Sequence, residues 1–255
     1  MEDPPLASLS LTHVNYNPDD RLSYLCAWLA LVPQGLCITY ATLVWSTREV
    51  EVLLMFTGQL ACEALNWCLK RYIKEERPRR EIPGTGHFCA SFIHSATTNR
   101  YICGTEMNGK GYGMPSSHAQ FVAFFSVTLA LFLLFRHLPH PTQTHTPITF
   151  IERALLALIS ILGAGAVAWS RIYLNYHTPQ QVLVGCAAGA GFAGVWFAFT
   201  SYLRKAEWID WALDMAPARA LRFRDLVVQE DLVDAGWARW DSQRKKRLLK
   251  PEKDR

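Results

Sequence analysis

Residues 170–181 read Ser-Arg-Ile-Tyr-Leu-Asn-Tyr-His-Thr-Pro-Gln-Gln and lie between two apolar runs, Ala154–Trp169 and Val182–Leu203. At about 1.5 Å of rise per helical residue, each run is long enough to cross or nearly cross a hydrocarbon core of about 30 Å. Arg171 and His177 are therefore expected where two membrane-spanning helices meet at a membrane surface. Polar residues in such a position usually serve a function or contact lipid headgroups.

The residues after His177 are typical of a helix start, since Thr178 suits the N-cap and Pro179 the first helical position. His177 is therefore expected just outside a helix N-terminus, facing out of the membrane.

Half of the 255 residues are hydrophobic, which fits one membrane domain with soluble ends better than two soluble domains. The formal net charge of +4 gives no indication of nucleic acid binding and is compatible with anionic membrane lipids as partners. No basic segment precedes the first apolar run, so we expect no cleaved signal peptide. Cys89 and Cys103 share a polar loop and would pair only if that loop faced an oxidising lumen, which the sequence leaves open.

We expect an all-α protein, a polytopic integral membrane helical bundle with about five transmembrane helices. A polar N-terminal segment (1–21) precedes the membrane domain (22–203), and a basic C-terminal tail (204–255) follows it with a sequence that suits amphipathic helices on the membrane. Pro33 is expected to kink the first span. The predicted spans are Leu22–Trp45, Val52–Leu69, Ala119–Phe135, Ala154–Trp169 and Val182–Leu203.

Five spans place the two ends of the chain on opposite sides of the membrane. The basic run at 244–247 and the charges Arg136 and Arg153 favour the cytosol for the tail and for the connector between the third and fourth spans. The long polar loop at 71–115 and the turn at 170–181 then share the other membrane surface.

A first polar cluster, residues 70–78, ends the second span. Lys70 and Arg77 are seven residues apart and face the same way if the helix continues for two turns, and Glu63 and Asn66 belong to the same stripe. Glu63 is costly within a span unless it is paired, and Lys70 or Arg77 is a candidate partner. The alternatives are an interfacial anchor for the cations and simple helix packing for Glu63.

A second cluster, Pro115-Ser116-Ser117-His118, opens the third span. Ser116 suits the N-cap, and the free N–H groups of the first turn favour an anion. The alternative is capping alone.

The third cluster joins the first two at one predicted membrane surface. It contributes Ser170, His177 and Arg171, whose planar guanidinium can bind two phosphate oxygens at once unless it only contacts headgroups. A phosphoryl group needs positive charge on its oxygens, a nucleophile in line and an acid for the leaving oxygen, and histidine suits the last two roles. No acidic cluster resembles a magnesium or zinc site, so we expect no metal and no cofactor.

The three clusters, taken in order, resemble the signatures of the type-2 phosphatidic acid phosphatase superfamily. In that superfamily they usually read Lys-x6-Arg-Pro, Pro-Ser-Gly-His and Ser-Arg-x5-His-x3-Asp. Here they read Lys70-x6-Arg77-Pro78, Pro115-Ser116-Ser117-His118 and Ser170-Arg171-x5-His177.

The resemblance implies a mechanism for the matching positions. His177 would attack the phosphorus and form a phosphohistidine, and His118 would protonate the leaving oxygen. The groups implied to hold the phosphoryl oxygens are Lys70, Arg77, Arg171, Ser116, Ser117 and the local backbone N–H groups.

The sequence departs from the family pattern at two positions. Ser117 replaces the usual glycine and adds a hydroxyl near the phosphate. Gln181 stands where an aspartate usually orients the nucleophilic histidine. Its amide oxygen could orient His177, or Gln181 could complete a capping box with Thr178. Another carboxylate, such as Glu63, could supply the negative charge that an amide lacks.

The pattern at 176–182, together with Asn66-Trp67-x2-Lys70, resembles the dolichyldiphosphatase branch. That resemblance implies a multi-pass endoplasmic reticulum enzyme that hydrolyses a polyprenyl diphosphate, dolichyl diphosphate, to dolichyl phosphate on the lumenal side, recycling the glycan carrier for protein N-glycosylation. A broader lipid phosphate phosphatase acting on phosphatidate or a sphingoid phosphate, and a catalytically silent lipid-binding relative, are the alternatives.

Overall fold

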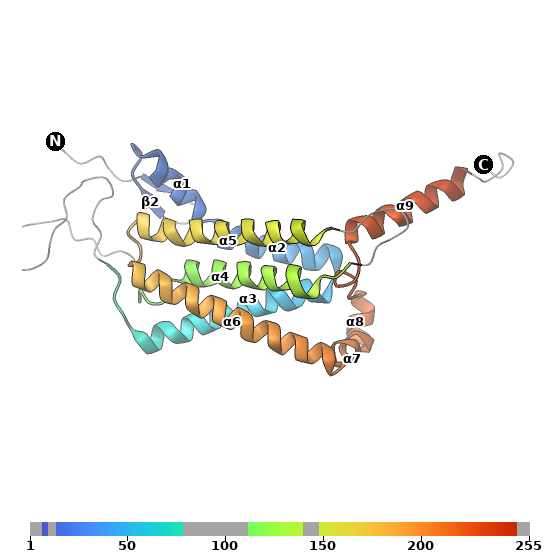
Figure 1. Cartoon of the computed structure of the whole chain (residues 1–255). Coiled ribbons are helices and arrows are strands. Elements are labelled where there is room, and N and C mark those ends of the chain that lie inside the picture. The colour runs from blue at the N-terminus through green and yellow to red at the C-terminus, as the bar shows by residue number, and fades with distance from the viewer. Residues whose placement is uncertain (1–6, 10–13, 79–111, 140–147, 249–255) are drawn as a thin grey trace, which may run out of the picture. The chain divides into compact units, whose positions relative to one another are not determined.

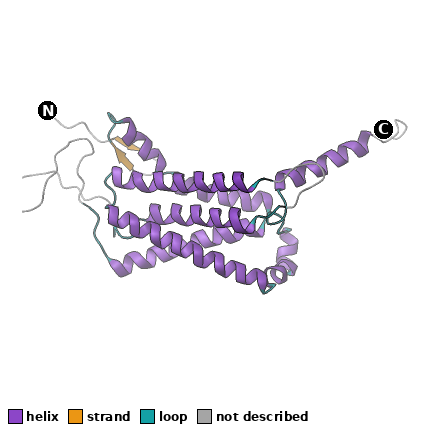
Figure 2. Ribbon diagram, in the orientation of Figure 1, coloured by secondary structure: helices purple, strands orange, loops and turns teal. Residues whose placement is uncertain are grey.

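The computed structural model describes residues 7–9, 14–78, 112–139 and 148–248, which are mostly helical (Figure 1 and Figure 2). Cys89, Cys103 and most of the polar loop at 71–115 lie outside the described residues. The elements in chain order are β1 (Ala7–Leu9), β2 (Val14–Tyr16), α1 (Arg21–Leu29), α2 (Val32–Thr47), α3 (Val50–Ile73), α4 (Ser117–Leu131), the π-helical turn η1 (Phe132–Arg136), α5 (Phe150–Tyr173), α6 (Pro179–Lys205), α7 (Trp208–Asp214), α8 (Ala216–Leu221) and α9 (Leu232–Leu248).

Five helical stretches of the described chain are long and apolar enough to cross a membrane, which confirms the predicted number of spans. Each extends past the predicted apolar run at both ends, because the polar residues that flank the run are still helical. The protein is an all-α, multi-pass membrane protein. The five stretches are Arg21–Thr47, Val50–Ile73, Ser117–Arg136, Phe150–Tyr173 and Pro179–Lys205.

The first span consists of two helices, since α1 ends at Leu29 and α2 begins at Val32 with Pro33 in its first turn. Proline lacks the N–H of a helix interior and clashes with the carbonyl four residues earlier, so a helix tends to begin anew there. The predicted kink at Pro33 is confirmed as a break, and Ala30 lies in it.

Two further features lie near the ends of the chain. The antiparallel pair β1–β2, with Ala7 opposite Tyr16, is absent from the sequence-based expectation. The predicted tail contains helices α7, α8 and α9, as expected. That these helices lie on a membrane stays a prediction, and so do the segment limits 1–21, 22–203 and 204–255.

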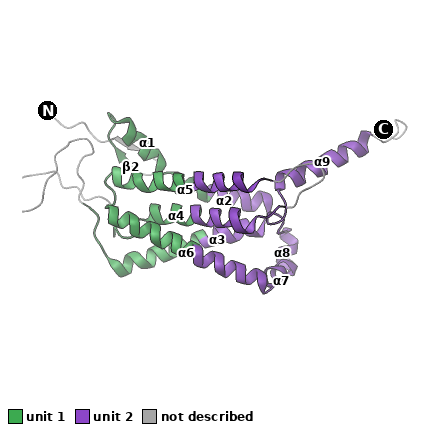
Figure 3. Ribbon diagram, viewed as in Figure 1, with its two compact units in different colours: residues 1–37, 59–125, 162–193 green, residues 38–58, 126–161, 194–255 purple. Residues whose placement is uncertain are grey.

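The chain divides into two compact units (Figure 3). Unit 1 comprises residues 1–37, 59–125 and 162–193, and unit 2 comprises residues 38–58, 126–161 and 194–255. Helices α2 to α6 each contribute residues to both units.

Within unit 1, α6 packs closely on α4 through two glycines. A Cβ at Gly185 would lie 2.7 Å from the backbone oxygen of Ser116, and one at Gly189 would lie 2.3 Å from that of Gln120. Small residues four apart allow membrane helices to approach backbone to backbone. This contact brings the first turn of α4 beside the first turn of α6, where the predicted site residues gather.

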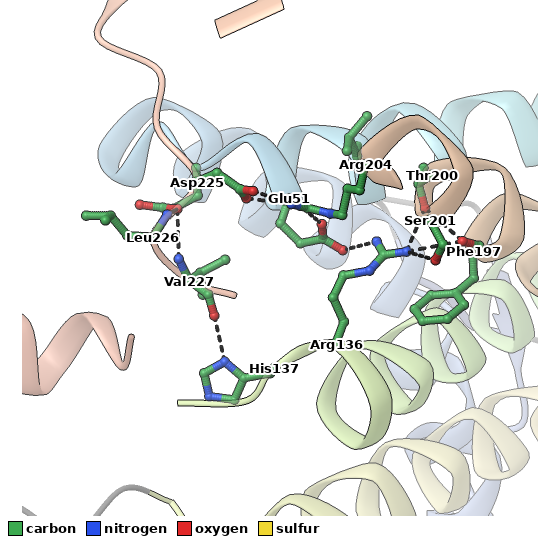
Figure 4. Close-up of polar contacts among 12 residues, drawn as sticks. Glu51, Arg136, His137, Phe197, Thr200, Ser201, Arg204, Asp225, Leu226 and Val227 are labelled. Atoms are coloured by element: carbon green, nitrogen blue, oxygen red, sulfur yellow. Dashed lines mark hydrogen bonds and ion pairs between the residues drawn. The ribbon is translucent and has the colours of Figure 1, made fainter. Parts of the chain in front are cut away.

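Within unit 2, buried charges join α3, η1, α6 and the segment that follows α8 (Figure 4). Glu51 accepts from Arg136 at 2.5 Å and also from Arg204, which binds Asp225 as well. Glu49 is fully buried and accepts from Arg224 Nε at 2.7 Å and from two backbone N–H groups. The carboxylates of the cluster therefore have cationic partners.

Two arginines at the ends of the predicted connector between the third and fourth spans are buried in unit 2. Arg136 is 9% exposed and Arg153 is 8% exposed. Arg136 binds Glu51, and Arg153 donates to the carbonyl oxygens of Leu133 and His137. Because both have internal partners, they do not support a cytosolic connector, and the basic run at 244–247 is left as the evidence for sidedness.

Candidate active site

A tight turn between α5 and α6 brings His177 back against Arg171. The N–H of Tyr176 donates to the Arg171 carbonyl at 3.0 Å, and the N–H of Asn175 donates to that of Ile172 at 2.9 Å. Asn175 has a φ of 57°, so the turn is a Schellman motif with asparagine in its left-handed position. The His177 N–H also points to the Arg171 carbonyl, at 3.3 Å, which fixes the spacing between the two residues.

The predicted helix start after His177 is confirmed, because α6 begins at Pro179. The Gln181 N–H donates to Thr178 Oγ1 at 3.2 Å, and the Thr178 N–H donates to Gln181 Oε1 at 3.3 Å, which completes the capping box. The same Oε1 lies 3.1 Å from Nδ1 of His177. The capping role and the His-orienting contact of Gln181 therefore occur together.

The hydrogen bonds of Gln181 also assign the tautomer of His177. Gln181 Nε2 lies 2.8 Å from Oε1 of Glu75 and 3.0 Å from the Glu76 carbonyl, and both of these groups accept. Gln181 Oε1 must then face the donors, so Nδ1 of His177 carries a hydrogen. In the neutral ring this leaves the lone pair on Nε2.

The surroundings of His177 keep its ring neutral. The residue is 5% exposed, and burial lowers the pKa of His177 to about 4. The hydrogen bond to Gln181 opposes this shift, whereas the nearby cations Arg77, Lys70 and Arg171 add to it. At neutral pH, Nε2 of His177 is therefore an unprotonated nitrogen close to three cationic side chains.

His118 lies in the first turn of α4, and its Nε2 is 3.2 Å from the carbonyl oxygen of Ala30. A carbonyl only accepts, so Nε2 carries a hydrogen and Nδ1 is the ring nitrogen left for proton transfer. The break before Pro33 thus places the Ala30 backbone where it orients His118.

Ser116 precedes α4 but does not cap it with its side chain. Its Oγ is buried and has no hydrogen-bond partner among the described residues. Its N–H donates to the Gln181 carbonyl at 3.1 Å. The first intrahelical bond runs from Gln120 to Ser116, which leaves the N–H groups of residues 117–119 outside the helical ladder.

Arg171 is 2% exposed, and no ion pair joins it to a carboxylate among the described residues. Within the part of the chain that the structure describes, its guanidinium donates at 3.4 Å to two neutral groups, the carbonyl of Cys26 and the hydroxyl of Ser170, and lies 5.4 Å from the ring centroid of Tyr176. A buried guanidinium with so few partners is suited to an anionic ligand.

Lys70 and Arg77 do not lie on one continuous helix, so the condition under which they would face the same way is not met. Helix α3 ends at Ile73, because Lys74 adopts a left-handed φ of 54°. Arg77 follows in an extended segment, where its Nε is buried without a hydrogen-bond partner in the described chain and burial lowers its pKa. No ion pair joins Lys70 or Arg77 to a carboxylate among the residues that the structure describes.

The predicted supporting residues have mixed outcomes. Asn66 Nδ2 donates to Gln120 Oε1 at 2.7 Å, and Gln120 Nε2 donates to the Cys62 carbonyl at 3.0 Å, which ties α3 to α4. No ion pair joins Glu63 to Lys70 or Arg77 in the described part of the chain.

Sequence reasoning missed the two residues that complete these contacts, Gln120 and Glu75. Glu75 lies between Lys70 and Arg77 within the first motif. The missing aspartate at position 181 is a reason to search the motifs for another carboxylate, and that search would have included Glu75.

The family model of the PAP2 superfamily matches residues 51–205, a range that includes all three motifs. The chain belongs to this superfamily. As a PAP2 protein it is a membrane phosphatase, and the fold class and family that the sequence predicts are confirmed.

Relatives in other organisms share most of the length of this PAP2 chain. A putative dolichyldiphosphatase of Neurospora crassa is 48% identical, covering 94% of this chain and 93% of its own. Dolichyldiphosphatase 1 of Homo sapiens is 36% identical over 75% of this chain and 71% of its own. The dolichyldiphosphatase of Saccharomyces cerevisiae is 29% identical over 84% and 79%.

Proposed function

We propose that the protein hydrolyses dolichyl diphosphate to dolichyl phosphate and inorganic phosphate through a phosphohistidine on His177. The proposed location is the endoplasmic reticulum membrane with the site on the lumenal side, where the reaction recycles the glycan carrier for protein N-glycosylation. The substrate follows from the relatives, which are named dolichyldiphosphatases.

One observation supports this chemistry above the others. The buried His177 donates through Nδ1 to Gln181 and keeps a lone pair on Nε2, close to three cations that have no carboxylate partner in the described chain. Positive charge held in place at low solvent exposure stabilises the oxygens of a transferring phosphoryl group.

The first step forms a bond between Nε2 of His177 and the terminal phosphorus, and the phosphoanhydride bond breaks. His118, protonated on both ring nitrogens when the substrate is bound, gives the proton on Nδ1 to the leaving oxygen, which departs as dolichyl phosphate. His118 then takes a proton from water, the hydroxide attacks the phosphohistidine, and inorganic phosphate leaves while Nε2 regains its lone pair.

The phosphoryl oxygens are assigned to the groups left without strong partners. Lys70, Arg77 and Arg171 would neutralise their charge, and Ser116 Oγ with the N–H groups of residues 117–119 would donate to them. We propose that the reaction is metal-independent, because these cations supply the charge that a metal ion supplies in other phosphatases.

The number of spans and the basic run at 244–247 support a lumenal site. Five spans separate the N-terminal segment from the basic run at 244–247, which favours the cytosol. The turn that carries His177 precedes the last span, so it lies on the side opposite the tail.

The direct test is phosphate release by the detergent-solubilised protein given dolichyl diphosphate, dolichyl phosphate and phosphatidate in parallel, with His177→Ala as the blank. We expect a strong preference for the diphosphate that the variant abolishes. Equal release from phosphatidate would instead indicate a broad lipid phosphatase, and no release by folded protein would indicate a silent lipid-binding relative.

A further inference from the structure

We propose that Glu75 is a positioning residue for the reaction, since its carboxylate holds the Gln181 amide in the orientation that keeps His177 reactive. The inference rests on the proposed role of His177 as the nucleophile. Glu75 binds Gln181, and Gln181 in turn contacts His177, so Glu75 would act through Gln181.

A glutamine next to a catalytic histidine presents a problem that an aspartate does not. Its amide can turn by 180°, which places an N–H group rather than an oxygen toward Nδ1 of His177. The ring would then accept at Nδ1 and carry its hydrogen on Nε2, so the nitrogen that must attack would have no lone pair. In serine proteases the same tautomer error, caused by an asparagine in place of the triad aspartate, costs about 10⁴-fold in turnover.

Glu75 prevents this rotation. Its Oε1 accepts from Gln181 Nε2 at 2.8 Å, and the Glu76 carbonyl accepts from the same nitrogen at 3.0 Å. In the turned amide the oxygen would face both acceptors, and the NH₂ group would face the N–H of Thr178. A hydrogen bond to a carboxylate is about twice as strong as one between neutral groups, so Glu75 contributes most to the preference.

The backbone around Glu75 is built to hold the carboxylate in place. The left-handed Lys74 ends α3, and the Gly113 N–H donates to the Glu75 carbonyl at 2.7 Å. A Cβ at Gly113 would lie 2.8 Å from Gln181 Nε2 and 2.9 Å from the Glu76 oxygen. Only a glycine lets this segment close over the Gln181 amide.

Glu75 also supplies a negative charge one hydrogen bond further from the ring than the usual aspartate would. Glu63 is a candidate for the substitute carboxylate on the basis of the sequence. In the described residues, however, the carboxylate that hydrogen-bonds to Gln181 is that of Glu75. In the family pattern one aspartate both orients the histidine and carries the negative charge. Here Gln181 would orient His177, and Glu75 would carry the charge.

The test compares single and paired substitutions in the full-length protein in detergent, assayed with dolichyl diphosphate. We expect Glu75→Ala to lower kcat about 100-fold with KM changed less than about twofold, because the proposed role of Glu75 is to orient Gln181 and not to bind substrate. Glu75→Gln keeps an acceptor and should lose less. Glu230→Ala, which removes an exposed carboxylate in the tail, is the matched control and should leave kcat and KM unchanged.

A reciprocal swap separates positioning from a merely structural role. Gln181→Asp alone sets two carboxylates against each other and should lower kcat at least as much as Glu75→Ala. Combining it with Glu75→Gln restores one amide and one carboxylate in the opposite order, and we expect kcat to recover at least tenfold over Gln181→Asp. If Glu75→Ala does not fold, the comparison of Gln181→Asp with the double variant is sufficient to test the positioning role.

The outcomes distinguish the two proposals. Normal kcat in Glu75→Ala, or a double variant no better than Gln181→Asp, would overturn the positioning role while leaving the function intact, provided that His177→Ala is inactive. Activity that survives His177→Ala would overturn the proposed function itself.

Discussion

The two units treat buried positive charge in opposite ways. In unit 2, Arg136 and Arg204 bind Glu51 (Figure 4). In unit 1, Arg171 is also buried, yet its partners in the described chain are a carbonyl, a hydroxyl and an aromatic ring. A buried charge without a counterion is costly and persists where a ligand supplies the opposite charge. We therefore interpret the paired arginines as structural, and we propose that the cations without a carboxylate partner in the described chain bind the phosphoryl group of the substrate.

The largest expected effect of this difference is on Arg171→Ala. We expect kcat/KM for dolichyl diphosphate to fall about 10³-fold or more, because the bidentate contact to the phosphoryl group is lost. The melting temperature should stay level or rise, since the substitution removes an uncompensated buried charge. A melting temperature that falls as far as that of Arg136→Ala would show that the two arginines do not differ in role.

The converse variant, Arg136→Ala, should mainly affect stability. The variant removes one of the two arginines that pair with the buried Glu51. We therefore expect the free energy of unfolding to fall by about 3–5 kcal/mol. Activity per folded molecule should be unchanged, as measured by phosphate release normalised to the folded fraction. Replacing Glu51 with glutamine and Arg136 with methionine together should recover part of the stability, because Arg204 keeps Asp225.

A smaller effect concerns the pH dependence of turnover. Burial and the neighbouring cations lower the pKa of His177 to about 4, and protonation below that value removes the lone pair of Nε2. After correction for substrate ionisation measured by ³¹P NMR, kcat/KM should therefore not decrease from pH 7 to about 5, since His118 also has to be protonated to act as the acid. It should fall about tenfold per unit below pH 4. An acidic limb near pH 6.5 would mean that the site is solvated and that the cations do not act on His177.

The smallest expected effect is that of chelation. Because cationic side chains supply the charge on the phosphoryl oxygens, EDTA should leave the rate of phosphate release within error of the untreated protein. Loss of activity that a divalent cation restores would contradict the metal-independent reaction.

The sequence predicts those features that depend on local patterns. Apolar runs predict the five spans, and Thr178 with Pro179 predicts the start of α6. Each of these patterns is set by neighbouring residues, so no alignment or tertiary contact is needed to find it.

Contacts between distant segments are not predictable in this way. The sequence gives no sign that Lys74 would end α3 before Arg77, or that Glu75 would meet Gln181 across 106 positions. It also misplaces Arg136, whose partner Glu51 is 85 positions away. The sequence alone does not distinguish a charged residue that is exposed from one that is ion-paired or one that binds a ligand. These cases are distinguished by the tertiary structure.

The most direct test of the account is the position of the phosphoryl group on the trapped intermediate. The protein is mixed with ³²P-labelled dolichyl diphosphate, quenched in alkali within milliseconds, and digested for mass spectrometry and phosphohistidine isomer analysis. We predict phosphate on Nε2 of His177, because Gln181 keeps the hydrogen on Nδ1. Phosphate on Nδ1 of His177, on His118, or on no histidine during measured turnover would contradict the account.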